Sequence, residues 1–265
     1  MSDDSEFYNM RFGGIGRLYG RDALSKLQKA HMAVVGLGGV GSWAAEALAR
    51  SGVGRLTLIE LDDVCMTNTN RQLHATQSQI GRAKIDVIAE RLKDINPEIH
   101  LYCHADFLNK RNIGDYIKGQ DVVIDAMDSV NVKSALAAYC SATKIRLIIV
   151  GSSGGKQDPT QIRVADLGHT ESDPMLSKLR SQLYRLHNFS RDGRRKFRID
   201  AVYSSEQMLY PKPDGSVCMD KSVLESGVKL DCAGGFGSSV MVTGSFGFVA
   251  ASRALQRYLG TMKKN

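Results

Sequence analysis

The chain has 265 residues, a formal net charge of +7 and an isoelectric point near 9.1. Its apolar content of 43% and charged content of 24% are ordinary for a globular protein and exclude an intrinsically disordered chain. The positive charge favours a polyanionic partner such as nucleic acid.

Two features predict a cytoplasmic protein. The first residues, Met-Ser-Asp-Asp-Ser-Glu, are acidic and polar and therefore do not form a signal peptide. The five cysteines contain no C-x-x-C pair and are odd in number, which indicates reduced thiols in an intracellular protein. Residues 6–30 predict a helical N-terminal cap with Leu24 and Leu27 on its apolar side and with spare arginines, among them Arg11 and Arg17.

The most informative motif is the stretch 33–41, Ala-Val-Val-Gly-Leu-Gly-Gly-Val-Gly. Its apolar residues predict a strand, residues 42–50 predict a helix, and Gly36, Gly38 and Gly41 have the G-x-G-x-x-G spacing. Such a turn lets free amides at a helix N-terminus face a phosphate. The motif alone predicts a nucleotide site, with a dehydrogenase as the default interpretation and a merely tight connection as the alternative.

A second strand is predicted at residues 56–61 and completes a β-α-β unit. Glu60 and Asp62 fall 19 and 21 residues after Gly41, the distance at which an acidic side chain can accept hydrogen bonds from ribose hydroxyls. A turn carboxylate at a strand end is the alternative. The spacing does not decide between Glu60 and Asp62.

The polar residues that follow change the expected ligand. Asn68, Asn70, Arg71 and Gln72 would form a polar wall for a triphosphate, for which a dehydrogenase has no obvious use. Arg71 could bind two phosphate oxygens through its guanidinium group. Lys84, at the start of the next predicted helix, would add a point charge near the same phosphates, or else belong to a solvated basic helix start.

Further strands are predicted at residues 101–105, 121–126 and 147–150. Asp128 follows the second of these, and a carboxylate just beyond a parallel strand lies in the crevice where such sheets bind ligands. Beside a triphosphate, Asp128 would hold Mg²⁺. It would also suit the N-cap of a helix predicted from residue 130 to residue 142, and the two roles are compatible.

Beyond Lys156 the pattern predicts strands at 161–167 and 199–203, with a helix from Asp173-Pro174 to about Leu186 between them. Residues 191–198 hold five cations in eight positions, the densest positive cluster of the chain, and follow Lys178, Arg180 and Arg185. This cluster is a candidate contact for an RNA backbone, with a solvated loop as the alternative.

The last informative segment contains Cys232 and the uncharged stretch 233–252. Cys232, in a glycine-rich loop, is either a catalytic thiol at the crevice or a small packed apolar residue. The stretch is long enough to span a bilayer, but its glycines, serines and threonine instead favour a helix packed inside the protein or at a dimer interface.

In combination, these motifs resemble the ThiF/MoeB/HesA superfamily, the bacterial relatives of ubiquitin-activating enzymes. The resemblance rests on residues 36–41, 60–62, 68–72, 84 and 125–128. Further stretches are similar to the branch of tRNA threonylcarbamoyladenosine dehydratases, at residues 11–14, 17–20, 158–162, 231–233 and 244–249.

This resemblance implies an α/β fold, with a Rossmann-like, mostly parallel sheet, helices on both faces, and further strands and helices in the C-terminal half. We expect one adenylation domain spanning residues 1–265, with a nucleotide-binding half at about 30–155 and a half facing substrate and RNA at about 156–265. The implied activity is ATP-dependent dehydration of N6-threonylcarbamoyladenosine at position 37 of tRNAs that read ANN codons. ATP activates the threonyl carboxylate, and a neighbouring nitrogen of the modification closes a ring with net loss of water.

The resemblance also assigns roles to residues. Those that would hold the nucleotide, its ribose or its phosphates are Gly36, Gly38, Gly39, Gly41, Glu60, Asp62, Asn68, Asn70 and Gln72. Those that would take part in catalysis are Arg71, Lys84, Asp128 as the magnesium ligand, and Arg17. Cys232 is added as a candidate catalytic residue from its place in the glycine-rich loop. The superfamily usually carries an N-terminal arginine that reaches the ATP of the partner subunit in a homodimer. This chain has Gly13-Gly14 there, so that Arg17 or Arg11 would substitute.

Two other functions compete with this interpretation. An adenylyltransferase for the C-terminal glycine of a ubiquitin-like sulfur-carrier protein would usually carry two C-x-x-C pairs for structural zinc, and this chain has none. A non-catalytic, nucleotide-sensing RNA-binding scaffold would have no need for Arg71, Lys84 and Asp128 together. A cysteine desulfurase or sulfur acceptor is a further partner that the sequence leaves open.

Overall fold

The computed structural model describes residues 3–220 and 236–260. Its centre is a seven-stranded sheet in the order β3-β2-β1-β4-β5-β7-β6, and only β6 runs antiparallel to its neighbour. The strands are β1 (His31–Val35), β2 (Arg55–Ile59), β3 (His100–His104), β4 (Val122–Asp125), β5 (Arg146–Val150), β6 (Ile162–Asp166) and β7 (Asp200–Ser204). A small hairpin joins β8 (Tyr210–Pro211) and β9 (Val217–Cys218).

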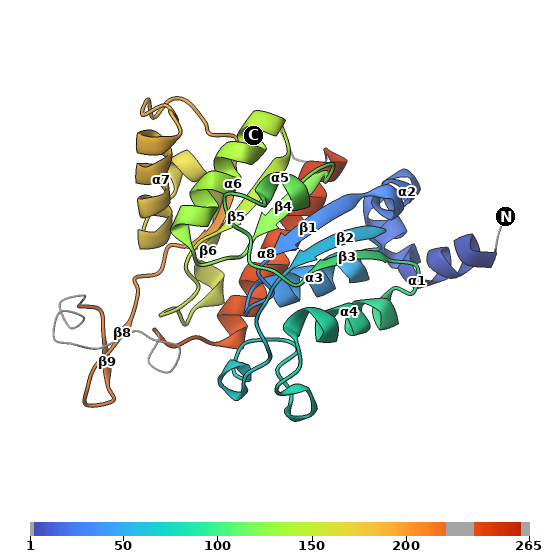
Figure 1. The fold of residues 1–265 in the computed structure, drawn as a ribbon, viewed down its shortest axis with the longest axis horizontal. Coiled ribbons are helices and arrows are strands. Elements are labelled where there is room, and N and C mark those ends of the chain that lie inside the picture. Colours follow the sequence, from blue (N-terminus) through green and yellow to red (C-terminus); the bar gives the residue numbers. More distant parts are fainter. Residues whose placement is uncertain (1–2, 221–235, 261–265) are drawn as a thin grey trace.

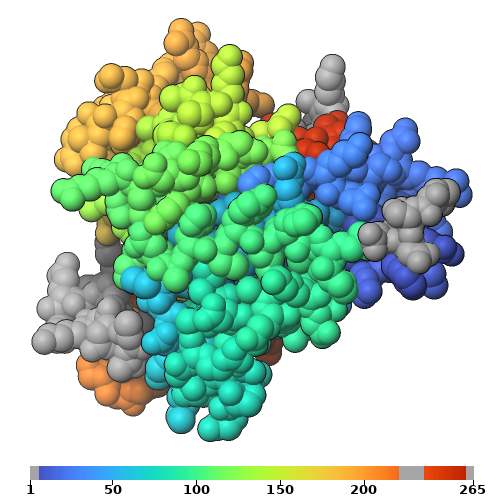
Figure 2. Space-filling model, turned by 45° about the vertical axis from the view of Figure 1, so that its right-hand side comes forward, coloured from blue at the N-terminus to red at the C-terminus, as the bar shows by residue number. Residues whose placement is uncertain are grey.

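Helices cover both faces of this sheet (Figure 1). One face carries α3 (Gly41–Arg50), α4 (Lys84–Ile95) and α8 (Val240–Leu259). The other carries α5 (Ile113–Tyr116), α6 (Val130–Thr143) and α7 (Pro174–Leu186). The N-terminal helices α1 (Asp3–Tyr19) and α2 (Arg21–Lys29) form one end of the molecule, opposite α7 (Figure 2).

The inner strands β1, β4 and β5 consist mostly of buried apolar residues because both faces of the sheet are covered there. In β1, Val34 packs into the core beneath α3, α4 and α8, whereas Val35 packs into the core beneath α5, α6 and α7. Both side chains are at most 1% exposed. A parallel sheet covered by helices on both faces requires this continuous apolar pattern, rather than alternation.

The fold class expected from the sequence is confirmed, and most predicted elements lie within a few residues of their expected places. The predicted N-terminal helix is two helices, because Gly20 interrupts it with a φ of 98°. The uncharged stretch 233–252 contributes to α8, in which Ala250 and Ala254 are fully buried. Across the described parts of the chain, no helix is long and apolar enough to cross a membrane.

A buried carboxylate fastens α8 to the sheet. Asp200, at the start of β7, is 3% exposed and accepts hydrogen bonds from the guanidinium groups of Arg253 and Arg257. Burial alone would raise the pKa of Asp200, but the hydrogen bonds from Arg257 and Arg253 outweigh burial and hold this pKa below its usual range. The ionised form is therefore favoured in the folded protein.

We predict that Asp200→Asn lowers the free energy of unfolding by about 2–3 kcal/mol at neutral pH, because two partly buried cations lose their counter-charge. The folded-state pKa of Asp200 is depressed, so its contribution is present above the unfolded-state pKa of about 4 and is lost as the pH falls through the folded-state value. Urea unfolding at several pH values measures this: the difference between variant and wild type shrinks below about pH 4. Asp192→Asn, which breaks the exposed Arg194–Asp192 pair, is the matched control, and an equal loss in both variants would contradict the prediction.

Candidate active site

The candidate site lies where the order of the strands reverses. From β1 the chain proceeds to β2 and β3 on one side, and later to β4 and β5 on the other. Neighbouring parallel strands whose connections leave in opposite directions open a crevice at their carboxyl ends, where α/β sheets bind ligands. The glycine turn after β1 and the connection after β4 meet in this crevice.

The glycine turn depends on close backbone packing. Gly36 has a φ of 83°, and a Cβ atom there would lie 3.2 Å from the carbonyl oxygen of Ala126, just after β4. A Cβ atom on Gly41 would overlap the carbonyl oxygen of Gly36. Glycine is therefore required at both positions, and the tight turn directs the N-terminus of the ten-residue helix α3 into the crevice.

Glu60 ties the glycine turn to the end of β2. The residue is 8% exposed, and its Oε2 atom accepts a hydrogen bond of 2.8 Å from the amide of Leu37. The Oε1 atom accepts bonds of 3.0 Å from the amides of Leu61 and Asp62. Glu60 thus orders two loops through three amides, whereas the side chain of Asp62 is 54% exposed.

The polar segment 68–72 lies beside the glycine turn, as the sequence predicts. A Cβ atom on Gly39 would lie 3.1 Å from Cγ of Arg71, and one on Gly38 would lie 4.0 Å from Nε2 of Gln72. Arg71 donates from Nη1 to the carbonyl oxygen of Thr67 and to Oδ1 of Asn70, each at 2.9 Å.

Three hydrogen bonds, two of them partly buried, hold this polar segment in place. The Oδ1 atom of Asn68 accepts the amide of Cys65 at 3.1 Å, and Nδ2 of Asn70 donates to the carbonyl oxygen of Ser238 at 2.8 Å. Trp43, in the first turn of α3, donates from Nε1 to the carbonyl oxygen of Arg71 at 3.0 Å. Trp43 is not among the residues predicted from the sequence, although it is the only tryptophan of the chain and closely follows the glycine motif.

Lys84 belongs to the same cluster. Its side chain is 6% exposed, and its Nζ atom lies 3.0 Å from Oδ2 of Asp62. His74 is buried nearby, and burial together with the charge of Lys84 lowers its pKa to about 4. His74 is therefore neutral near pH 7, and the positive charge in this part of the crevice comes from Lys84 and Arg71.

Asp128 lies on the connection between β4 and α6, with its side chain exposed. The structure places the N-cap of α6 at Ser129, so the alternative role of Asp128 as the helix cap is not the one adopted. Beneath it, Lys133 and Asp125 form a fully buried ion pair, with 2.9 Å between Nζ and Oδ1. Lys133 also donates to the carbonyl oxygens of Asp125 and Val150.

The buried pair of Asp125 and Lys133 was missed by the sequence analysis. Lys133 links the carboxyl ends of β4 and β5 under the connection that carries Asp128. The available signal was a lysine one turn inside an otherwise apolar helix, eight positions after an aspartate that ends a strand. A lysine is rarely fully buried unless it has a partner.

One predicted site residue, Arg17, is not brought to the crevice, and another, Cys232, lies outside the described residues. Arg17 lies on α1, which Tyr8 anchors by a hydrogen bond to the carbonyl oxygen of Gly52, before the amino end of β2. The helix that carries Arg17 thus lies at the amino ends of the strands, whereas the crevice lies at their carboxyl ends. Cys232 lies outside the described residues, and its predicted place at the crevice stays a prediction.

A sequence profile of the ThiF family matches residues 14–264. The chain belongs to the ThiF family. Within this family, it is 49% identical to the tRNA threonylcarbamoyladenosine dehydratase of Escherichia coli (strain K12), over 96% of both chains. It is 38% identical to the protein of the same name from Bacillus subtilis (strain 168), over 74% of both chains.

A solved structure of a ThiF-family relative agrees with this assignment. The E. coli tRNA N6-threonylcarbamoyladenosine dehydratase, TcdA, in complex with ATP, has a TM-score of 0.86 and 45% identity to this chain. The similarity covers 98% of this chain and 97% of that one. The family expected from the sequence is therefore confirmed, and with it the Rossmann-like fold.

The geometry of this ThiF-family site predicts different roles for its two neighbouring carboxylates. Glu60→Gln should lower the free energy of unfolding by about 1–3 kcal/mol, because an amide group cannot accept all three backbone hydrogen bonds. Asp62→Asn should weaken nucleotide binding and, although Lys84 loses its carboxylate partner, lower the free energy of unfolding by less than Glu60→Gln does, because the Asp62 side chain is 54% exposed. Equilibrium unfolding and calorimetric titration with ATP measure the two effects, and the reverse assignment of effects would contradict this interpretation.

Proposed function

We propose that this protein is an ATP-dependent tRNA threonylcarbamoyladenosine dehydratase. It activates the threonyl carboxylate of N6-threonylcarbamoyladenosine at position 37 of tRNA and closes that side chain into a ring. The observation that carries this proposal is the crevice itself, where the glycine turn and Arg71 lie at the N-terminus of α3 and Lys84 pairs with Asp62 beyond β2. The similarity to dehydratases over nearly the whole chain supports the same substrate.

The residues of the crevice fit ATP by their chemistry. The amides at the start of α3 and the turn from Gly36 to Gly41 would hold the phosphate chain. Arg71 and Lys84 would neutralise the phosphates, with Asn70 orienting the guanidinium group that it already contacts. Asp62, exposed beyond β2, would bind the ribose hydroxyls, because Glu60 is occupied by backbone amides.

The residues also fit Mg²⁺, with Asp128 as the protein ligand. Among the described residues, no group of three histidine, cysteine or acidic side chains could hold a metal ion by itself. Mg²⁺ characteristically uses one or two carboxylates together with nucleotide phosphates, so one exposed aspartate beside a triphosphate suffices. When bound, the ion would reduce the negative charge that repels an incoming carboxylate.

The reaction requires little covalent chemistry from the protein. An oxygen of the threonyl carboxylate attacks a phosphorus atom of ATP and displaces the leaving phosphate group, which gives a mixed anhydride. A nitrogen of the same modification then attacks the activated carbonyl carbon, and the former carboxylate oxygen departs with the phosphate-containing product. Arg71, Lys84 and the amides of α3 stabilise the charge on phosphate and hold the two reactants together.

This assignment gives the two parts of the chain different roles. Residues of about 30–155 would bind the nucleotide, and those of about 156–265 would face the tRNA, within one adenylation domain. We place the reaction in the cytoplasm, where its substrate tRNA is found. A sulfur-carrier adenylyltransferase is less suitable, because the chain lacks the C-x-x-C pairs usual in those enzymes.

We further propose a homodimer in which Arg17 reaches the ATP of the partner subunit. Arg17 lies over the two glycines that stand at the usual arginine position, since Cβ atoms on Gly13 and Gly14 would lie 3.6 and 3.8 Å from its guanidinium nitrogens. Its guanidinium group thus lies beside the positions at which the superfamily usually has its arginine. A cysteine desulfurase or sulfur acceptor would be a separate partner.

The test of this function is incubation of the protein with Mg-ATP and tRNA that carries the threonylcarbamoyl modification, followed by mass analysis of the released nucleosides. We expect loss of one water from the modified nucleoside, dependent on ATP. Asp128→Asn should reduce this turnover by about a hundredfold or more without changing the thermal midpoint, because the exposed carboxylate contributes charge rather than packing. Asp115→Asn, an equal change at another exposed aspartate, is the control.

An unchanged nucleoside mass with the wild-type protein would refute the dehydratase function. Full activity of Asp128→Asn would instead remove Asp128 from the site and leave the function standing.

Mixing two inactive variants tests the shared site. Arg17→Ala and Asp128→Asn should each be inactive alone, and subunit exchange should restore about a quarter of wild-type activity, because half of the dimers then contain one complete site. Turnover of the mixture measures this. No recovery after demonstrated exchange would show that Arg17 does not act on the partner's site.

A further inference from the structure

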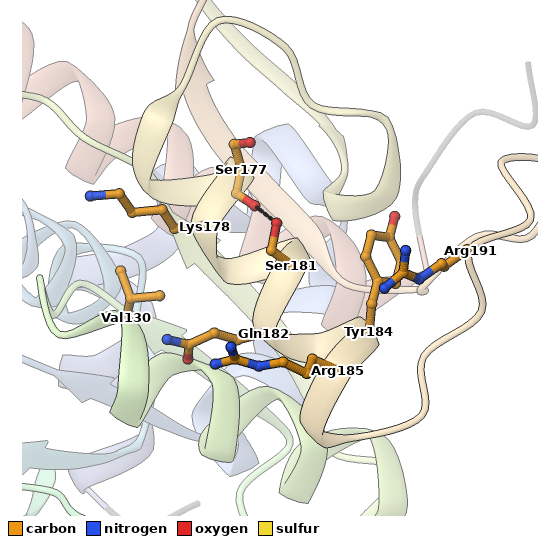
Figure 3. Close-up of a pocket in the computed structure, with 8 residues that line it drawn as sticks. All are labelled: Val130, Ser177, Lys178, Ser181, Gln182, Tyr184, Arg185 and Arg191. Atoms are coloured by element: carbon orange, nitrogen blue, oxygen red, sulfur yellow. Dashed lines mark hydrogen bonds between the residues drawn. The ribbon is translucent and has the colours of Figure 1, made fainter.

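The described surface has a hollow beside the candidate active site, between the first turn of α6 and the outer side of α7. It has a volume of about 640 Å³. It is lined by Val130, Ser177, Lys178, Ser181, Gln182, Tyr184, Arg185 and Arg191 (Figure 3). Val130 is two residues after Asp128, so one end of the hollow adjoins the connection that carries the proposed magnesium ligand.

The lining of this hollow is positively charged. Among the described residues that line it are Lys178, Arg185 and Arg191, and none of these lining residues is an aspartate or glutamate. All three cations are exposed, and none forms an ion pair with a carboxylate of residues 3–220 or 236–260. Unpaired cations around a concave surface attract a polyanion, and the remaining serine and glutamine side chains can donate hydrogen bonds to phosphate or ribose.

An aromatic platform lies at one end of the hollow. The guanidinium carbon of Arg191 lies 5.4 Å from the centre of the Tyr184 ring. The same ring packs edge-on against Phe197, with 5.7 Å between centroids, which holds it in place. Aromatic rings and guanidinium planes are the surfaces on which proteins stack the unpaired bases of RNA.

The basic loop 191–198 extends this surface, and its backbone is fixed. The carboxylate of Asp166 accepts the amides of Phe197 and Arg198 at 2.9 and 2.7 Å. The side chains of Arg195 and Lys196 remain exposed. A loop with an ordered backbone and projecting cations presents charge at set positions, unlike a freely solvated charge run.

A polar contact connects the hollow to the site. Gln182 of α7 donates from Nε2 to Oδ1 of Asn131 at 2.8 Å, and Asn131 is three residues after Asp128. Helices α6 and α7 are also packed together in one core. The distance between the basic surface and the β4–α6 connection is therefore set by packed elements.

From these observations we propose that the hollow and the loop 191–198 bind the anticodon arm of the tRNA substrate. Lys178, Arg185 and Arg191 contact phosphates, and one unpaired base of the loop stacks at Tyr184 and Arg191. This inference rests on the proposed function and names the surface that holds its substrate. Because position 37 lies in the anticodon loop, a single-stranded segment bound here delivers the modified adenosine to the neighbouring crevice.

The test is a triple variant, Lys178→Gln, Arg185→Gln and Arg191→Gln, titrated with a fluorescein-labelled, threonylcarbamoyl-modified tRNA at several salt concentrations. Each phosphate contact contributes about 0.7–0.9 to the slope of log Kd against log salt. We expect this slope to fall by about 2–3 and the affinity to fall at least tenfold near 0.1 M salt. The KM for tRNA should rise, while kcat at saturating tRNA and the affinity for ATP stay at wild-type values.

The matched control is Arg21→Gln, Lys26→Gln and Lys29→Gln on α2, which removes the same charge from exposed positions at the opposite end of the molecule. The slope of log Kd against log salt for this control should differ from the wild-type slope by less than one phosphate contact contributes, about 0.7–0.9. Equal affinities and slopes for the two triple variants would overturn the proposal. Failure of the wild-type protein to bind tRNA would also overturn the proposal.

A second pair of variants separates stacking from charge. Tyr184→Leu should weaken tRNA binding with an unchanged salt slope, and Tyr184→Phe should restore the binding, because both rings offer an aromatic face. Equal binding by the leucine and phenylalanine variants, with both folded by circular dichroism, would overturn the stacking contact. If the wild type binds tRNA through these residues but does not dehydrate it, the binding surface stands and the proposed function fails.

Discussion

The buried carboxylate of Glu60 is the contact on which the candidate active site depends. Three backbone amides donate to it, one from the glycine turn after β1 and two from the loop after β2. These loops carry different parts of the site: the first ends in the N-terminus of α3, and the second leads to Asp62 and the segment 68–72. A single side chain therefore fixes the spacing between the phosphate-binding turn and the polar wall, and it does so with the negative charge that the amides prefer.

On the side of β4 and β5, a buried ion pair beneath the crevice supports the candidate site. The pair of Asp125 and Lys133 is fully buried, and Lys133 also binds the carbonyl oxygen of Val150, so the ends of β4 and β5 are joined under the connection that carries Asp128. Burying two charges is costly, and such a pair contributes little stability compared with apolar residues of the same size. Its effect here is to hold the ends of β4 and β5 in place beneath the connection that carries Asp128. Loss of either partner would leave an unpaired charge buried beneath the site.

The motifs close to one another in sequence were predictable, and those that depend on distant contacts were not. The glycine turn, Arg71 and Lys84 follow from local spacing and from the parallel sheet that this spacing implies. The choice between Glu60 and Asp62 did not follow, because it depends on which carboxylate the amides of a separate loop reach. Likewise, Trp43 and Lys133 donate hydrogen bonds to carbonyl oxygens 28 and 17 positions away in the sequence. No local sequence pattern predicts such bonds. The break at Gly20 was missed because the apolar spacing continues across it.

We propose that the crevice activates the threonyl carboxylate by forming a bond between one carboxylate oxygen and a phosphorus atom of ATP. Labelling both oxygens of the threonyl carboxylate with oxygen-18 tests this claim most directly. The mechanism predicts that one labelled oxygen remains in the cyclised nucleoside and that the other appears in AMP or in inorganic phosphate, whichever product receives the carboxylate oxygen. Ring closure with no label in any phosphate-containing product would contradict it.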